Sequence, residues 1–597
     1  MFERGGPTLS SDDLHHAIAG EGLSRSPVGR VISVTGSRAG VGILPTGDRR
    51  SHPTATVGRF VGLRAGQSFI VAMITEATAE LPPGAREQGF ETSIYIDLMG
   101  EIRRDADGAG RFKRGVSEYP AIGDEAVPLD ADILRLIYAT DDKGLANVGT
   151  LHQDQALPAC VDVEGLVSKH FALLGTTGVG KSSAMAVILN EIIALRPDLR
   201  IFLLDGHNEY GRCFGERANV INSRNVKLPF WLFNFEEFTD VVYGGRPAVA
   251  EEVEILAEVL PIAKGLYTQY KGGDRAMRRK GDPRVSGFTV DTPVPYTIQD
   301  LLSQIDERMG RLENRGARMH YHRLMTRIET IRNDPHYAFM FENANVGGDT
   351  MGELLTNLFR LDSAAKPISV MQMAGLPPET IDAVVCVLCR LAFDFGLWSE
   401  GAVPLLFVCE EAHRYASSDA SAGFTPTRRA LTRIAREGRK YRVSLGLVTQ
   451  RPAELDPTII AQCGTLFAMR MANDRDQALL RSAVSDAATN LLSFVPTLAT
   501  GEAVAFGEGV TVPVRLAFRR MPPERVPRNE LSQALGHPGS GAGDVDFIRS
   551  VVERWRGASM SGRPRHEEAE AEESPDLRLL RNRLESSLLR PSPTSAG

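Results

Sequence analysis

One glycine-rich stretch constrains this chain more than any other feature. It is Gly175-Thr-Thr-Gly-Val-Gly-Lys-Ser182, preceded by the apolar run Phe171 to Leu174 and followed by apolar residues at helical spacing. This order of strand, glycine loop and helix is the context that a phosphate-binding loop requires. Glycines let backbone N–H groups approach a phosphate closely, and the helix N-terminus adds partial positive charge at the same point. The stretch therefore predicts a nucleotide site inside an α/β domain.

We expect this loop to bind ATP together with Mg²⁺. Lys181 is expected to reach the β- and γ-phosphates, and the hydroxyl of Ser182 to ligate Mg²⁺. The predicted nucleotide-binding residues are Gly175, Thr176, Thr177, Gly178, Val179, Gly180, Lys181, Ser182 and Ser183.

Paired acids after a second apolar run predict the other half of the site. The run Val403 to Cys409 ends in Glu410 and Glu411. In such a pair one acid holds Mg²⁺ through water, and the next polarises the attacking water, so we assign Glu410 to the metal and Glu411 as general base. Gln450 ends a further strand, Val443 to Thr449, and is predicted to sense the γ-phosphate or to orient the water.

A third strand end adds polar candidates. The continuous apolar run Arg200 to Asp205 is typical of a strand that is buried on both faces. Polar residues at the carboxyl end of such a strand point into the ligand crevice. Asp205, His207 and Glu209 are therefore candidates for positioning water, Mg²⁺ or a neighbouring subunit.

The length of 597 residues is too great for one core, so several domains are expected. Residues 1–28 are interpreted as a loose leader. Short β-rich runs over 29–160, with a late strand at Asn147–Leu151, predict a small barrel or sandwich that serves for assembly or docking. Residues 161–520 are predicted to form the ATPase core, interrupted by a mostly helical insertion at about 211–365. Residues 521–597 are predicted to be a linker and tail, with an amphipathic helix at Leu577–Leu588.

Charge limits how the chain could bind nucleic acid. The formal net charge is −7, so any nucleic-acid contact must be local. A basic loop at 271–284, with Arg278, Arg279 and Lys280, is interpreted either as a phosphate contact or as a solvated surface loop.

Cysteine usage and hydropathy favour a cytoplasmic protein. The six cysteines are few and mostly lie in apolar patterns, which suits a reducing compartment. Cys386 and Cys389 are expected inside a buried helix rather than in a redox or metal site. Neither a signal peptide nor a run of membrane-spanning length is recognised.

Taken together, the motifs resemble the HerA family of hexameric DNA translocases, within the HerA/FtsK group of RecA-like P-loop ATPases, and a bacterial member in particular. Besides the glycine loop, the resemblance is carried by the following segments: Asp205-Gly-His-Asn-Glu-Tyr, Pro229-Phe-Trp-Leu-Phe-Asn-Phe-Glu-Glu, Glu410-Glu-Ala-His-Arg-Tyr, Ala435-Arg-Glu-Gly-Arg-Lys-Tyr, Val448-Thr-Gln-Arg-Pro and Gly501-Glu-Ala-Val-Ala-Phe-Gly-Glu-Gly. It implies an N-terminal barrel of the HerA–ATP-synthase type, a RecA-like core and a helical insertion.

The resemblance also implies residue roles. Glu411 matches the catalytic acid and Gln450 the polar sensor, while Arg436 and Arg439 match a segment that acts on phosphate charge. Lys169 matches a position that acts across the subunit boundary. We expect the basic cluster of Arg433, Arg436, Arg439 and Lys440 to reach phosphate in a neighbouring or in the same active site.

The function implied is a homohexameric ring that moves double-stranded DNA with ATP. An effector protein, either a nuclease or a sirtuin-like NAD-hydrolysing protein, is expected to dock on the barrel, with the tail as the rival docking site. The expected setting is DNA end processing or antiphage defence. Two alternatives are a conjugation- or segregation-type DNA pump, and an ATPase scaffold that gates an effector with little DNA transport.

Overall fold

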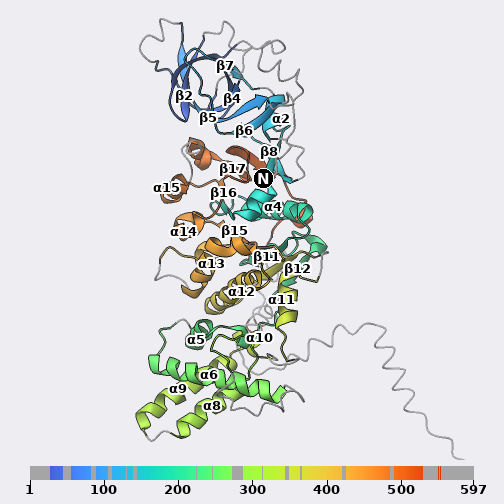
Figure 1. Ribbon diagram of the computed structural model, residues 1–597, viewed down its shortest axis with the longest axis vertical. Helices are drawn as coiled ribbons and strands as arrows, with labels where there is room; N and C mark the ends of the chain where they lie inside the picture. Colours follow the sequence, from blue (N-terminus) through green and yellow to red (C-terminus); the bar gives the residue numbers. More distant parts are fainter. Residues whose placement is uncertain are drawn as a thin grey trace, which may run out of the picture.

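The structure is a computed structural model that describes residues 27–528 with internal gaps, together with 549 and 552. The chain forms three layers along its longest axis: a β-barrel, a large α/β layer and a helical bundle (Figure 1). The gaps fall at 45–55, 67, 82–88, 105–109, 130, 139–143, 223–224, 245, 272–286, 312–313, 343, 345–347, 363–365, 420–424 and 484–489.

The N-terminal layer is a closed six-stranded antiparallel barrel, as the short β-rich runs predict. Its core includes Val31, Val41, Leu63, Ile70 and Ile96, which are all buried. Closure pairs every barrel strand on both sides and so removes open edges. Around the barrel the strands are β1 (Gly29–Val34), β2 (Arg38–Ile43), β5 (Thr92–Arg104), β4 (Ser68–Thr78), β3 (Phe60–Ala65) and β7 (Glu125–Pro128), with β6 (Gly110–Arg114) added beside β5.

The late strand predicted for the barrel lies elsewhere. β8 (Leu145–Leu151) and β9 (Pro158–Asp162) form a hairpin, and β8 pairs with β18 (Val514–Phe518) in the sheet of the middle layer. Among the described residues between the barrel and this hairpin, α2 (Ala131–Tyr138) is the one helix. The sequence pattern identifies β8 as a strand but not its partner, because that partner is more than 350 residues away along the chain.

The middle layer is an eleven-stranded sheet, which agrees with the predicted α/β class. Its order begins with seven parallel strands: β12 (Ala218–Ile221), β13 (Ile368–Gln372), β11 (Arg200–Asp205), β14 (Leu405–Cys409), β15 (Val443–Thr449), β10 (Phe171–Leu174) and β16 (Thr465–Met469). The order continues with four antiparallel strands: β17 (Glu502–Gly507), β18, β8 and β9.

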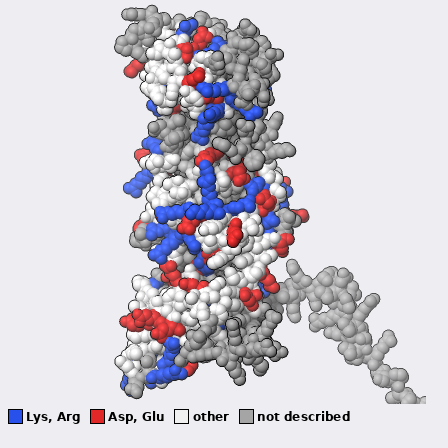
Figure 2. Space-filling model, viewed as in Figure 1, with Lys and Arg blue, Asp and Glu red and all other residues white. Residues whose placement is uncertain are grey.

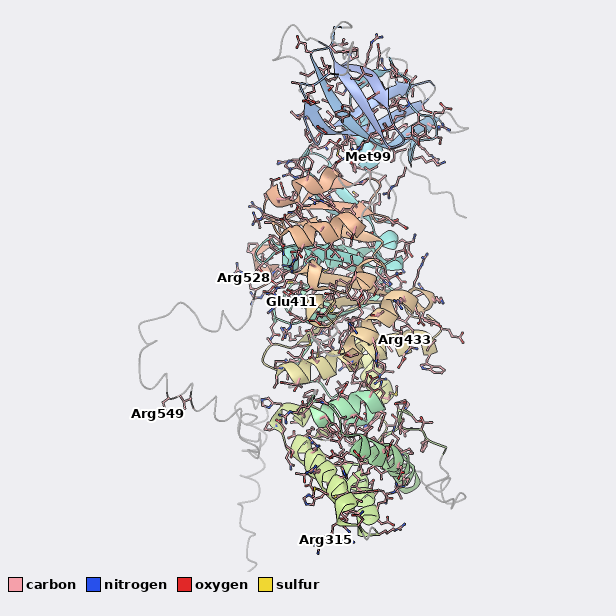
Figure 3. The ribbon with its side chains drawn as sticks, turned by 90° about the vertical axis from the view of Figure 1, so that its left-hand side faces the viewer. Met99, Arg315, Glu411, Arg433, Arg528 and Arg549 are labelled. Atoms are coloured by element: carbon pink, nitrogen blue, oxygen red, sulfur yellow. The ribbon has the colours of Figure 1, made fainter. Side chains whose placement is uncertain are left out.

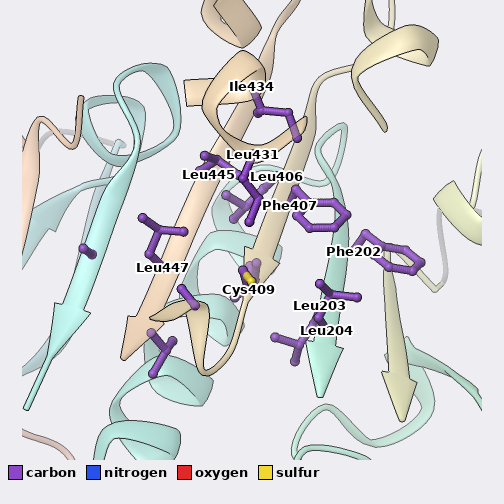
Figure 4. Close-up of a cluster of buried hydrophobic side chains, with 14 of the residues drawn as sticks. Phe202, Leu203, Leu204, Leu406, Phe407, Cys409, Leu431, Ile434, Leu445 and Leu447 are labelled. Carbon is purple, nitrogen blue, oxygen red and sulfur yellow. The ribbon is translucent and has the colours of Figure 1, made fainter. Parts of the chain in front are cut away.

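Helices cover this sheet and bury its central strands. Every residue of β10, β14 and β15 is buried, as expected for parallel strands between helices. Figure 4 shows Leu431 and Ile434 of one covering helix above side chains of β14 and β15. The helices of this layer are α3 (Val163–Ser168), α4 (Lys181–Leu195), α12 (Pro378–Trp398), α13 (Thr425–Glu437), α14 (Pro457–Ile460) and α15 (Asp474–Ala483). Cys386 and Cys389 lie buried inside α12, as predicted.

The segment 211–365 is mostly helical, but parts of it belong to the sheet. β12 pairs with β13, and α11 (Met351–Phe359) packs on β11 and β13. Beyond them, α6, α8 and α9 pack together at the end away from the barrel (Figure 1). The helices of this region are α5 (Phe235–Tyr243), α6 (Ala250–Lys271), α8 (Ile298–Gly310), α9 (Arg315–Arg332) and α10 (Ala338–Phe341).

Three predicted features lie wholly or mostly outside the described residues: the leader at 1–28, of which residues 27 and 28 are described, the loop residues Arg278, Arg279 and Lys280, and the tail helix Leu577–Leu588. Among the helices of the described part, none combines the length and the apolar character needed to cross a membrane.

Candidate active site

Most of the predicted site residues meet at one edge of the sheet. The central strands are parallel, so their carboxyl ends share that edge. β10 ends at the glycine loop, β14 at the Glu410–Glu411 pair and β15 at Gln450. Leu174 at the end of β10 is paired with Thr449 at the end of β15, and β15 also pairs with β14. The sheet therefore brings together residues that are 275 positions apart in the sequence.

The glycine loop has the geometry that its sequence predicts. Gly178 and Gly180 have φ angles of +78° and +96°, which other residues rarely adopt. A Cβ on Gly175 would lie 2.8 Å from Cβ of Met469, so this position has no room for a side chain. Nζ of Lys181 donates a 2.9 Å hydrogen bond to the carbonyl of Thr176, inside the loop. The hydroxyl of Thr177 donates to Oε1 of Gln450, which ties the predicted sensor to the loop.

The β11 strand end supports the start of α4. The hydroxyl of Ser182 donates a 2.8 Å hydrogen bond to Oε2 of Glu209. Asp205, which is fully buried, accepts hydrogen bonds from the backbone N–H groups of Glu209, at 3.0 Å, and Tyr210, at 2.9 Å. Burial raises the pKa of Asp205 to about 6. His207 in the same turn is exposed, so of the three candidates Asp205 and Glu209 are the ones built into the site.

The two acids after β14 are both buried, with 4% of Glu410 and 7% of Glu411 exposed. Glu411 has a φ of +52°, a strained conformation for a residue other than glycine, and such strain is commonly found at active sites. One carboxylate oxygen of each, Oε2, has no hydrogen-bond partner among the described residues. Burial, and then the charges of Asp205 and Glu209, raise the pKa of Glu410 well above its usual value.

These residues fit a bound nucleotide with Mg²⁺. Glu410 and Glu411, with Glu209 nearby, offer carboxylate oxygens that a divalent cation could bind directly or through water. Burial lowers the pKa of Lys181, and the charges of Glu411, Glu410 and Glu209 act in the opposite direction. Among the described residues, no group of three His, Cys, Asp or Glu side chains could hold a metal alone.

Residue roles follow from this arrangement. Ser182 and Glu410 would hold the metal, the latter through water, and Lys181 would hold the phosphates. ATP supplies the phosphoryl group that passes to water. Glu411 would take the proton of that water, and Gln450 would orient it.

His413 is a part of the site that the sequence analysis did not assign. Its Nδ1 lies 3.3 Å from Oε2 of Glu411 and 3.1 Å from Oγ1 of Thr449. Burial lowers the pKa of His413, while the charge of Glu411 acts in the opposite direction. The ring lies where it can orient the Glu411 carboxylate. Its position two residues after the acid pair was the available signal.

The remaining predicted residues, Lys169, Arg436 and Arg439, lie at the opposite edge of the sheet. Lys169 precedes the start of β10, and α13 ends in Arg436 and Glu437 just before β15 begins. His170 links the two segments, because one ring nitrogen lies 3.0 Å from the carbonyl of Ala435 and the other accepts from the N–H of Leu445 at 2.9 Å.

This placement bears on the two alternatives left open for the basic cluster. β15 has seven residues, which separate Arg439 from Gln450 by roughly 20 Å. A separation of this size favours the neighbouring active site over the same one for Arg439. Figure 3 shows Glu411 and Arg433 toward opposite sides of the middle layer.

Comparison with known proteins points to one family. Residues 146–392 match the family described as the central domain of the helicase HerA. The DNA double-strand break repair helicase HerA of Pyrococcus furiosus is 26% identical over 461 residues, covering 71% of this chain and 76% of that protein. The HerA of Saccharolobus solfataricus is 25% identical over 437 residues, covering 72% and 78%. The solved structure of VirB4 of Thermoanaerobacter pseudethanolicus superposes with a TM-score of 0.43 and 15% identity, covering 64% of this chain and 99% of that one.

The family match spans β8 to α12, and so contains the glycine loop and the Asp205–Glu209 turn at the centre of the site. Both relatives are aligned over most of their own length. The chain is a P-loop ATPase that is similar to the HerA helicases, with residues 146–392 matching the central domain of that family.

Proposed function

We propose that this ATPase forms a homohexameric ring that moves double-stranded DNA. The observation that carries the proposal is the division of the predicted catalytic set between two edges of one sheet. The phosphate loop and the acids lie at the carboxyl edge, while Lys169, Arg436 and Arg439 lie at the amino edge. Neither Arg436 nor Arg439 is buried. A copy that presents its amino edge to the carboxyl edge of the next would complete the site, and repetition of that contact closes a ring.

Double-stranded DNA is the proposed substrate, and two observations support it. The relatives from Pyrococcus furiosus and Saccharolobus solfataricus are described as DNA double-strand break repair helicases. This acidic chain also carries local basic surface: α9 holds five arginines against one glutamate, and α13 holds four arginines. Figure 2 shows lysine and arginine side chains gathered over the middle layer. Counterion release from DNA would favour binding at such local surfaces.

The barrel is the proposed docking site for an effector, either a nuclease or a sirtuin-like NAD-hydrolysing protein, in DNA end processing or antiphage defence. The loop between β6 and β7 exposes Tyr119 and Ile122, and large exposed apolar side chains often mark protein-binding surfaces. The barrel is also tied to the motor, since Asn490 donates a 2.7 Å hydrogen bond to buried Asp97 of β5. A partner bound to the barrel could therefore be held firmly relative to the ATPase.

The test of DNA transport combines two measurements. ATP hydrolysis should rise when linear double-stranded DNA is added, and the protein should displace a third strand from a triplex in an ATP-dependent manner. If DNA does not change the rate of ATP hydrolysis and the third strand is not displaced, the result would favour a scaffold that gates an effector. Effector docking is tested by co-purification with the candidate partner after removal of residues 1–130, which spares β8 and β9, or of residues 557–597. Loss of the complex only on tail removal would contradict docking on the barrel.

A further inference from the structure

Trp398 stands out on the surface of the middle layer. It is the last residue of α12, a helix of 21 residues most of which are buried, yet 83% of its own side chain is exposed. Tryptophan carries one of the largest apolar surfaces of any residue and is usually well buried. Among the described residues, no other large apolar side chain is as exposed.

The backbone around Trp398 is held in place by close packing. A Cβ on Gly396 would lie 2.3 Å from Cγ2 of Val443, so only glycine lets the end of α12 approach β15 this closely. The N–H of Ser399 donates to the carbonyl of Phe395 at 2.9 Å, and the N–H of Gly401 to that of Gly396 at 2.9 Å. The exposed indole therefore projects from a fixed support.

Trp398 also lies at the amino edge of the sheet, which carries Lys169, Arg436 and Arg439. α12 leads into β14, so the indole lies at the amino edge. Tyr441, next to Arg439 and Lys440, packs against the end of α12. The amino edge thus carries three features on neighbouring strands: Trp398 before β14, the turn with Arg439 and Lys440 before β15, and Lys169 before β10.

The carboxyl edge of these same three strands carries the nucleotide site. The glycine loop after β10 would hold phosphate there, whose negative charge complements these cations, with buried Glu410 and Glu411 after β14 and Gln450 after β15. A second copy of the chain is therefore the partner whose charge fits this surface. Contacts of this kind are head-to-tail, because two different edges of identical chains meet.

We propose that Trp398 is an anchor of the contact between copies, packed against the carboxyl-edge side of the next subunit and covered there. The proposal rests on the hexameric ring proposed above. It identifies one residue that stabilises the interface between subunits near the nucleotide site. Tryptophans that become buried at interfaces are frequent hot spots, whose truncation weakens association by about 30-fold or more.

The test compares Trp398→Ala, Trp398→Phe and wild type in the full-length protein by sedimentation over a range of concentrations, with ATP present. Trp398→Ala should shift assembly to at least about 30-fold higher concentration. Trp398→Phe should shift it less, because a smaller ring remains. The matched control is Met319→Ala, which removes an exposed apolar side chain of α9, away from both sheet edges, and should assemble as wild type does.

A fluorescence measurement follows the same residue without disturbing it. In a Trp555→Phe background only Trp231 and Trp398 emit, and Trp231 is already fully buried. Assembly should move the emission to shorter wavelength as Trp398 leaves water. Binding of a fluorescent ATP analogue by dilute Trp398→Ala subunits should equal that of wild type, because the glycine loop lies at the other edge, and this shows that the variant is folded.

The possible outcomes separate this inference from the ring itself. If wild type assembles while Trp398→Ala assembles equally well, or while the emission stays unchanged, the inference is wrong and the ring stands. If wild type hydrolyses ATP without assembling at any concentration, both the ring and the inference are wrong.

Discussion

The hydroxyl of Ser182 donates a 2.8 Å hydrogen bond to Oε2 of Glu209. This contact joins the first turn of α4 to the turn that follows β11, and buried Asp205 holds that turn through two backbone N–H groups. The carboxylate of Glu209 thus orients Ser182, the predicted Mg²⁺ ligand. Glu209 is therefore a positioning residue for the metal site.

Glu209→Ala should lower ATP hydrolysis by about 10- to 100-fold, as is typical when a partner of a metal ligand is removed. It should also raise the Mg²⁺ concentration needed for half-maximal activity. Glu209→Gln should be milder, because an amide oxygen still accepts from Ser182. His207→Ala, in the same turn and exposed, is the matched control. An unchanged Mg²⁺ requirement in Glu209→Ala would contradict the positioning role.

Glu411→Gln should bind ATP but hydrolyse it about 10²- to 10⁴-fold more slowly, because the attacking water loses its base. Lys181→Ala should lose turnover, since the phosphates lose their cation. ATP binding and steady-state hydrolysis measure the two effects. Glu454→Gln is the control, because Glu454 follows β15 and pairs with Arg451 on the surface. Wild-type turnover by Glu411→Gln would move the base role to Glu410.

Arg436→Ala and Arg439→Ala should each be deficient alone, because stabilising developing phosphate charge is worth about 10³–10⁵ in rate in related reactions. Mixing either variant with Glu411→Gln should restore part of the activity. In a mixed ring some active sites combine an intact Glu411 from one kind of subunit with an intact arginine from the other kind. Hydrolysis measured across mixing ratios checks this, and a complete lack of rescue would place both arginines outside the chemistry.

The buried carboxyl of Asp205 should make stability depend on pH. Its pKa is about 6 in the fold against 3.8 for the ordinary group, so between these values the folded chain binds more protons than the unfolded chain. Its contribution to stability therefore falls as pH rises from about 4 to 6 and stays low above that. Across this pH window the free energy of unfolding of wild type should fall by up to about 3 kcal/mol relative to that of Asp205→Asn. Denaturant unfolding of both at pH 4.5 and 7.5 measures the difference, and equal changes would contradict the assigned environment.

Charge reversal at Arg315 and Arg323 of α9 should weaken binding to double-stranded DNA. Each lost phosphate contact should reduce the slope of log affinity against log salt by about one. Arg315 lies near the far end of the bundle (Figure 3). Arg327→Ala is a useful comparison, because Arg327 is already paired with Glu252. An unchanged slope in the double variant would mean that α9 does not contact DNA.

The sequence alone determined the local chemistry of this protein. Glycines at 175, 178 and 180 are required by backbone geometry, and the apolar runs before Asp205, Glu410 and Gln450 identify buried parallel strands. Each follows from rules that act over a few residues. The short runs between 29 and 128 likewise predict a small β structure, because alternation and turn residues are local signals.

Only the tertiary structure decided which distant segments meet. Strand pairing moved β8 from the barrel to the ATPase sheet, and the parallel order of β14, β15 and β10 placed Arg436 and Arg439 at the edge opposite the glycine loop. It also brought Glu209 to Ser182 and His413 to Glu411, and left Trp398 uncovered. The physical reason is that pairing between strands is non-local: a sequence pattern shows that a strand has buried faces, but not which strand lies beside it.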